Sequence, residues 1–188
     1  MATITFDNVK EELENFAKYV IQQSRSNLTR EGKVSSGTLY KSLGYEIEVE
    51  EGAALVNFLM EGYGKFVDEG VKGANPNKLP QGSKWKGIQK APTSPYKFGG
   101  MKSRGLKAAI NRWTIQKGLK GVRDKKTGKF LPRKSLQYLI TRSIYLSGLR
   151  ATMFFSKPFN RGQKKYFDAF ANAFALDVEK GIILGSKL

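Results

Sequence analysis

The stretch YEIEVEEGAALVNFLM, residues 45–60, decides the fold. Tyr45, Ile47 and Val49 alternate with three glutamates, and a period of two is typical of a strand with one buried face. Glu51-Gly52 predicts a turn, after which an apolar segment up to Met60 returns beside the first strand. The sequence therefore predicts an antiparallel hairpin, whose apolar face other elements must cover.

Amphipathic helices near both ends of the sequence are expected to provide that cover. Apolar residues recur at steps of three and four from Phe6 to Leu28, with Asp7 or Asn8 as the cap and Gly32 as the end. A second apolar stripe comprises Tyr166, Phe167, Phe170, Ala171, Phe174 and Val178. Neither helix can bury its stripe alone. The predicted fold class is thus α+β, a small antiparallel sheet packed by N- and C-terminal helices in a single domain, 1–188.

Residues 71–135, which we call the basic insert, interrupt this domain. They contain 18 of the 33 Lys and Arg residues but one acid, Asp124, so the net charge of +17 falls within them. The pattern predicts a long loop, a helix from about Lys102 to Gln116, a turn at 124–128 and a helix from Pro132 to Gly148. A β-like segment, 149–155, and a corner at 157–159 are expected to follow. We expect the insert to be mobile until the protein is assembled, because its apolar content is low and its charges repel one another.

The chemistry open to the chain is limited by what the sequence lacks. There is no His and no Cys, which removes the usual general base, thiolate metal ligands and disulfides. No Walker-type phosphate loop or calcium loop is present. No secretory signal or membrane span is recognisable, so we expect a soluble protein that is made in a cytoplasm.

A carboxylate-dependent nuclease is the enzyme class that remains to be considered. Asp68-Glu69 lies near an apolar strand, and Glu31 with Lys33 has the spacing of a nuclease motif without the strand that should carry it. We favour a solvated turn or a subunit contact for Asp68-Glu69. The expectation is therefore a protein that is not an enzyme and has no catalytic residues, cofactor, metal or small-molecule substrate.

A polyanion or an acidic protein surface is the partner that the basic insert favours. A merely solubilising surface is the alternative, but solubility does not require segregated bases. Trp85 and Tyr96 could stack on unpaired bases, although we favour a role in anchoring the loop. The residues expected to contact DNA or a partner protein are Lys84, Lys86, Lys102, Arg104, Lys107, Lys125, Lys126, Lys129 and Arg133.

Three short segments resemble the tail-completion or head–tail joining family of long-tailed bacteriophages. Ser36-Gly-Thr-Leu-Tyr-Lys-Ser-Leu43 is similar to that family's "threonine/serine-glycine-asparagine-leucine-x-x-serine-leucine", with Thr38 where Asn is common. The segment from Tyr63 to Gly70 is similar to "tyrosine-alanine-x-x-valine-glutamate-x-glycine", and Phe154 to Phe159 to an "arginine-proline-phenylalanine" corner before the last helix. The matching positions are Gly37, Leu39, Ser42, Tyr63, Phe66, Glu69, Gly70, Pro158 and Phe159. They fall in the family's order, within residues 1–70 and 149–180.

The resemblance implies a structural virion protein of the phage neck. Such a subunit would form a homo-oligomeric ring that joins the portal or adaptor complex to the tail, and it would be assembled in the host cytoplasm. Genome DNA would pass through the ring, where the basic insert could contact it or an acidic neighbouring ring. The alternative is a nonspecific nucleic-acid-binding protein that acts outside a virion.

Overall fold

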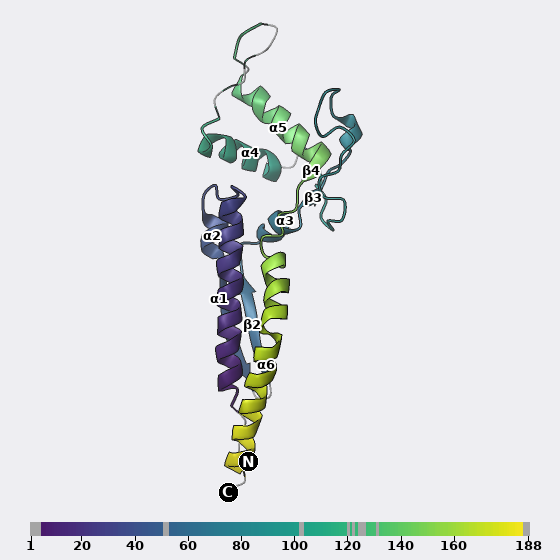
Figure 1. The fold of residues 1–188 in the computed structure, drawn as a ribbon. Helices are drawn as coiled ribbons and strands as arrows, with labels where there is room; N and C mark the ends of the chain where they lie inside the picture. Colours follow the sequence, from purple (N-terminus) through teal and green to yellow (C-terminus); the bar gives the residue numbers. More distant parts are fainter. Residues whose placement is uncertain are drawn as a thin grey trace. The chain divides into compact units, whose positions relative to one another are not determined.

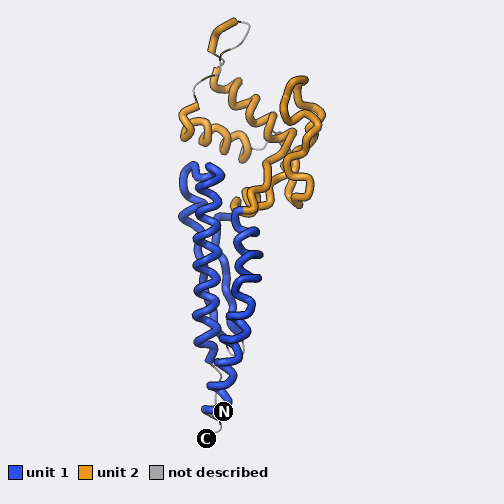
Figure 2. The backbone as a smooth tube through the Cα atoms, viewed as in Figure 1, with its two compact units in different colours: residues 1–62, 154–188 blue, residues 63–153 orange. Residues whose placement is uncertain are grey.

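The computed structural model describes residues 5–50, 53–101, 104–119, 121, 123, 127–130 and 132–185. It has the predicted α+β class, with helices and short antiparallel sheets (Figure 1). The chain divides into two compact units (Figure 2). Unit 1 comprises residues 1–62 and 154–188, and unit 2 comprises residues 63–153. The expectation that the chain behaves as a single domain stays a prediction.

The predicted hairpin is the sheet of unit 1. Strands β1 (Gly44–Glu50) and β2 (Ala53–Leu59) pair antiparallel, with Ile47 opposite Val56 and Glu48 opposite Leu55. Val56 and Phe58 lie on the more buried face of β2, whereas Leu55 and Leu59 lie on the exposed one. The alternation in the sequence therefore assigned the faces of β1 correctly, but the exposed face of β2 also carries leucines.

Helices α1 (Asp7–Arg30) and α6 (Ser156–Gly185) lie side by side along the hairpin, as Figure 1 shows. The buried ring of Phe16 on α1 joins the three elements, because it makes edge contacts with Phe58 of β2 and with Phe159 and Phe170 of α6. A Cβ atom at Gly162 of α6 would lie 2.7 Å from the Phe16 ring, so this close approach requires glycine. The prediction that both terminal helices pack on the sheet is confirmed.

The start of α1 is capped by a residue that the sequence did not point to. The cap position is Phe6, and neither Asp7 nor Asn8 caps the helix. The carboxylate of Asp177 on α6 instead accepts hydrogen bonds from the backbone N–H groups of Asn8 (3.1 Å) and Val9 (2.9 Å). Burial raises the pKa of Asp177, but these two bonds, the Asn8 side chain and Lys180 outweigh it and leave the pKa below its usual value. A tertiary contact thus caps α1.

The C-terminal region differs from the prediction in two ways. The strand ends at Leu149 and α6 begins at Ser156, so residues 157–159 form a first helical turn and not a corner. Proline is tolerated there because the first N–H groups of a helix have no intrahelical partner. The predicted stripe is also divided: Tyr166 and Phe170 face α1, whereas the side chain of Phe167 is 69% exposed.

Unit 2 contains three α-helices, a single-turn 3-10 helix and two short strands among its described residues. Their bounds are α3 (Gly64–Asp68), β3 (Val71–Lys72), η1 (Pro76–Lys78), α4 (Arg104–Gln116), α5 (Arg133–Ser147) and β4 (Gly148–Leu149). The helix expected between Pro132 and Gly148 is confirmed by α5, and Arg123 pairs with Phe130 across the predicted basic turn. Residues 124–126 of that turn lie outside the described residues.

The loop from Gly73 to Met101 packs closely against α5 and β4, and the expectation that the insert is mobile until assembly stays a prediction. The Gln89 amide bonds both backbone groups of Gly73, and the N–H groups of Ala74 and Lys90 donate to the carbonyls of Tyr145 and Ser147. Leu79 and Ala91 are buried. Backbone groups supply most of these bonds, and Lys78, Lys84 and Lys97 of the loop are exposed, which keeps their charges out of the packed interior.

Candidate nucleic-acid interface

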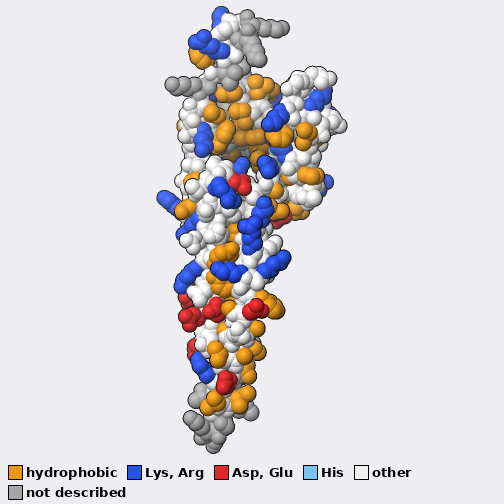
Figure 3. Space-filling model, in the orientation of Figure 1, with side chains coloured by type: hydrophobic (Ala, Val, Ile, Leu, Met, Phe, Trp, Pro, Cys, Tyr) orange, Lys and Arg blue, Asp and Glu red, His pale blue; other side chains and the backbone are white. Residues whose placement is uncertain are grey.

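The two compact units carry very different charges. Unit 1 has 12 Lys and Arg residues against 13 Asp and Glu residues, whereas unit 2 has 21 against 3. Figure 3 shows one face, on which most of the acidic side chains in view belong to unit 1. The basic region is therefore larger than the predicted insert of 71–135, because Lys65, Arg142 and Arg150 belong to the same unit.

The described residues that we expected to contact DNA all lie in unit 2. Lys84 and Lys86 lie in the loop that packs on α5, Lys107 is exposed on α4, and Arg133 begins α5. None of these residues makes an ion pair with a described residue, and neither does Lys129. Their positive charges are thus free to meet a polyanion, and the contact itself stays a prediction.

Some expected contact residues cannot be placed. Lys102, Lys125 and Lys126 lie outside the described residues, and for Arg104 the structure describes the backbone at the start of α4 but not the side chain. Asn111 of the same helix accepts a hydrogen bond from the side-chain amide of Gln137 on α5. This bond links α4 to α5, although Asn111 itself remains exposed.

The aromatic side chains of the loop have partners within unit 2. Tyr96 packs edge-on against Phe66 of α3, with the ring centroids 4.7 Å apart, which supports the anchoring role. Trp85 is half-buried, and the ammonium groups of Lys90 and Lys84 lie 4.6 and 5.6 Å from its ring centroid. A base that stacked on Trp85 would have to displace at least one of these cations.

The family-motif positions have structural roles that explain their residue types. Gly37 precedes α2 (Thr38–Ser42) with φ +77°, a left-handed conformation that favours glycine. Leu39 is buried, and the Ser42 hydroxyl accepts a hydrogen bond from the Glu61 N–H and donates one to the Leu39 carbonyl. These three residues fix the approach of the chain to the hairpin.

The second motif organises the entry into unit 2. Tyr63 and Glu69 flank α3, and Phe66 packs on Tyr96. Gly70 has φ +75°, and a Cβ there would lie 2.5 Å from the carbonyl oxygen of Leu149 and 2.7 Å from the Ala151 nitrogen. In the third motif, Pro158 is buried and Phe159 contacts Phe16 and Phe58. Phe66, Gly70, Pro158 and Phe159 thus serve packing or backbone geometry, whereas Tyr63 is 43% exposed.

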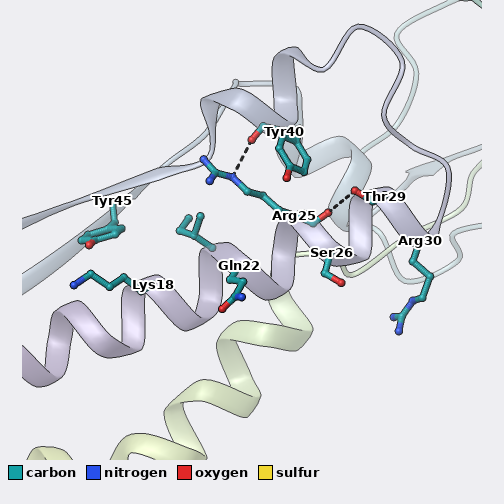
Figure 4. Close-up of a pocket in the computed structure, with 9 residues that line it drawn as sticks. Lys18, Gln22, Arg25, Ser26, Thr29, Arg30, Tyr40 and Tyr45 are labelled. Atoms are coloured by element: carbon teal, nitrogen blue, oxygen red, sulfur yellow. Dashed lines mark hydrogen bonds between the residues drawn. The ribbon is translucent and has the colours of Figure 1, made fainter.

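A cavity of about 790 Å³ lies beside α1 in unit 1 (Figure 4). Lys18 and Tyr45 lie together at one end of it, and Arg30 is at the other. Arg25, in between, donates to the carbonyls of Tyr40 (3.2 Å) and Leu43 (2.8 Å) at the end of α2, and it lies over the Tyr40 ring. These bonds satisfy carbonyl groups that the helix leaves free, so Arg25 has a structural role.

The nuclease candidates belong to different units. Asp68 is buried in α3 and Glu69 follows that helix in unit 2, whereas Glu31 and Lys33 follow α1 in unit 1. Over the described ranges, no three acidic side chains are grouped so that they could hold a metal ion. In the same part of the chain, no helix is both long and apolar enough to cross a bilayer.

Comparison with known proteins found no matching protein family, no matching curated protein and no matching solved structure.

Proposed function

We propose that this chain is a structural subunit of the neck of a long-tailed phage, where it forms a ring between the portal complex and the tail. Unit 1 is the scaffold that associates with other subunits. Unit 2 presents a cationic surface to DNA that passes through the ring or to an acidic neighbouring protein. The residues that serve the proposed role are surface residues, and the mechanism involves binding and no chemical step.

The separation of charge between the units is the observation that carries the proposal. A unit with 21 basic and 3 acidic residues repels itself, and a polyanion relieves that repulsion. A free DNA-binding protein does not need a second, nearly neutral unit with exposed Phe167, Leu55 and Leu59. Apolar side chains on such a surface are typical of subunit contacts. The three motifs resembling tail-completion proteins add support.

The proposal is tested in the phage that encodes the chain. A stop codon early in the gene should yield filled heads and complete tails that remain separate, and the wild-type protein supplied from a plasmid should restore joined particles. A reconstruction of the wild-type virion should place the protein at the head–tail junction. Its location elsewhere, or joined infectious particles without it, would overturn the proposal.

Nonspecific nucleic-acid binding outside a virion is the second candidate, and the excess of Lys and Arg residues in unit 2 favours it. It requires the isolated chain to bind duplex DNA in the micromolar range at physiological salt, with a logarithmic salt slope of about −5 or steeper. A variant with Lys84, Lys86, Lys107 and Arg133 changed to Glu should lose that binding. Binding that is undetectable at physiological salt would eliminate this candidate and leave the neck proposal standing.

A further inference from the structure

The exposed face of the hairpin in unit 1 is acidic and partly apolar. Glu46, Glu48 and Glu50 project from β1, and no described residue forms an ion pair with them. On β2 the same face carries Leu55, 49% exposed, opposite Glu48, and Leu59. There is no Lys or Arg on either strand. The three glutamates span about 14 Å, since an antiparallel strand rises about 3.4 Å per residue.

Helix α6 has an exposed face with the opposite charge. Lys157, Arg161 and Lys164 follow one another at steps of four and three, all exposed and without an ion pair among the described residues. Phe167, 69% exposed, lies one turn beyond Lys164 and beside the exposed Asp168, and we call the three bases together with Phe167 the α6 stripe. Lys157 and Lys164 are about 10 Å apart along the helix axis, at about 1.5 Å per residue. The basic row and the acidic row therefore have similar lengths.

We propose that the α6 stripe of one copy docks on the outward hairpin face of the next copy. The three bases would meet the three glutamates, and Phe167 would cover the exposed leucines of β2. Charge complementarity carries the choice of a second copy as the occupant, because residues 1–62 contain 6 bases against 10 acids and residues 154–188 contain 6 against 3. The inference rests on the proposed ring, for which it names the contact.

The two faces are different surfaces of one unit, so the contact is heterologous. Heterologous contacts build closed rings when the rotation between copies closes, and filaments when it does not. Each copy would give its α6 to one neighbour and receive α6 from the other. The same two faces thus account for every contact around a ring, without a further interface.

Charge reversal in the full-length chain tests the contact. One variant carries Glu46→Lys, Glu48→Lys and Glu50→Lys, and the other carries Lys157→Glu, Arg161→Glu and Lys164→Glu. Sedimentation velocity should show oligomers for the wild type. Each variant alone should associate about 100-fold more weakly, because three exposed attractions become repulsions. An equimolar mixture should regain oligomers, since each reversed face then meets its complement on the other variant.

A chain that carries both sets of reversals should also associate, because its faces are again complementary. Phe167→Ser should weaken association without lowering the thermal stability of the monomer, whereas Lys97→Glu in unit 2 serves as the control for a changed net charge. Circular dichroism establishes that each variant is folded. The proposal would be overturned by variants that assemble like the wild type, by a mixture that stays monomeric, or by a wild type that is monomeric at every concentration. A monomeric wild type would exclude this contact, and the phage experiment would still test the neck role separately.

Discussion

Different kinds of interaction stabilise the interior of unit 1 and the interior of unit 2. The buried apolar residues of unit 1 include Phe16, Val20, Leu28 and Phe154, and aromatic rings from three of its elements meet at Phe16. Unit 2 buries fewer large apolar side chains in its described part, and instead buries polar ones such as Ser94, Gln137 and Thr141. It also depends on glycines where two backbone segments touch.

The comparison indicates how a strongly cationic unit can fold. The charges at the ends of exposed lysine side chains have little effect on backbone hydrogen bonds or on close contacts at glycine. Unit 2 nevertheless buries few large apolar side chains in its described part, so its free energy of unfolding should respond to small changes in backbone geometry. Unit 1 should respond to changes in packing and in the cap of α1.

Deletion of residues 72–104 should unfold unit 2, which is the largest loss of stability that we expect. The deletion removes Lys72, which pairs with Gly148 of β4, and the buried Leu79 and Ala91, so α5 loses the loop that packs against it. Hydrogen exchange should show that α5 loses its protection while α1 and α6 keep theirs. If α5 stays protected, unit 2 does not need the loop in order to fold, as expected for an insert that is mobile until assembly.

Gly70→Ala should destabilise unit 2 by on the order of 4 kcal/mol. The left-handed backbone at this position disfavours a side chain, and the added Cβ would overlap with the backbone of residues 149 and 151. Gly82→Ala is the matched control, since Gly82 has φ +81° and nothing lies within 4 Å of its Cβ position. Urea unfolding should therefore separate the two variants by at least about 2 kcal/mol. Equal losses would show that only the backbone angle matters.

Asp177→Ala should destabilise unit 1 by about 1–3 kcal/mol, because it leaves two part-buried N–H groups at the start of α1 without their acceptor. The pKa of Asp177 in the folded state is below its ordinary value of 3.8. The carboxylate therefore stabilises the fold above that pH, and this contribution is lost as the pH falls through the folded-state pKa. Urea unfolding at pH 7 and in acid should show a smaller pH dependence in the variant than in the wild type.

Gly162→Ala and Gly105→Ala should have opposite signs and the smallest effects. The first pushes a methyl group into the Phe16 ring and should cost about 1–3 kcal/mol. The second adds a methyl group to α4 in open space and should stabilise unit 2 by about 0.5–1 kcal/mol. Thermal unfolding would measure both. A stabilising Gly162→Ala would mean that α1 and α6 are packed less closely than the structure shows.

The sequence by itself determined the features that repeat along the chain. The period of two at residues 45–49 and the three- and four-residue steps from Phe6 to Leu28 predicted the hairpin and α1, because a single buried face imposes each period. The excess of bases in residues 71–135 was also visible, since charge is additive and needs no coordinates.

The tertiary structure decided what depends on residues far apart in the sequence. Asp177 caps a helix that begins about 170 positions earlier. Gln89 accepts a hydrogen bond from the Gly73 N–H, and the Ser147 carbonyl accepts one from the Lys90 N–H, which gives the loop partners that the sequence did not identify. The division of the apolar residues of α6 into a buried face and an exposed face likewise depends on where α1 lies. Local patterns record which face of an element is apolar, but the partner of that face is fixed only when the whole chain is packed.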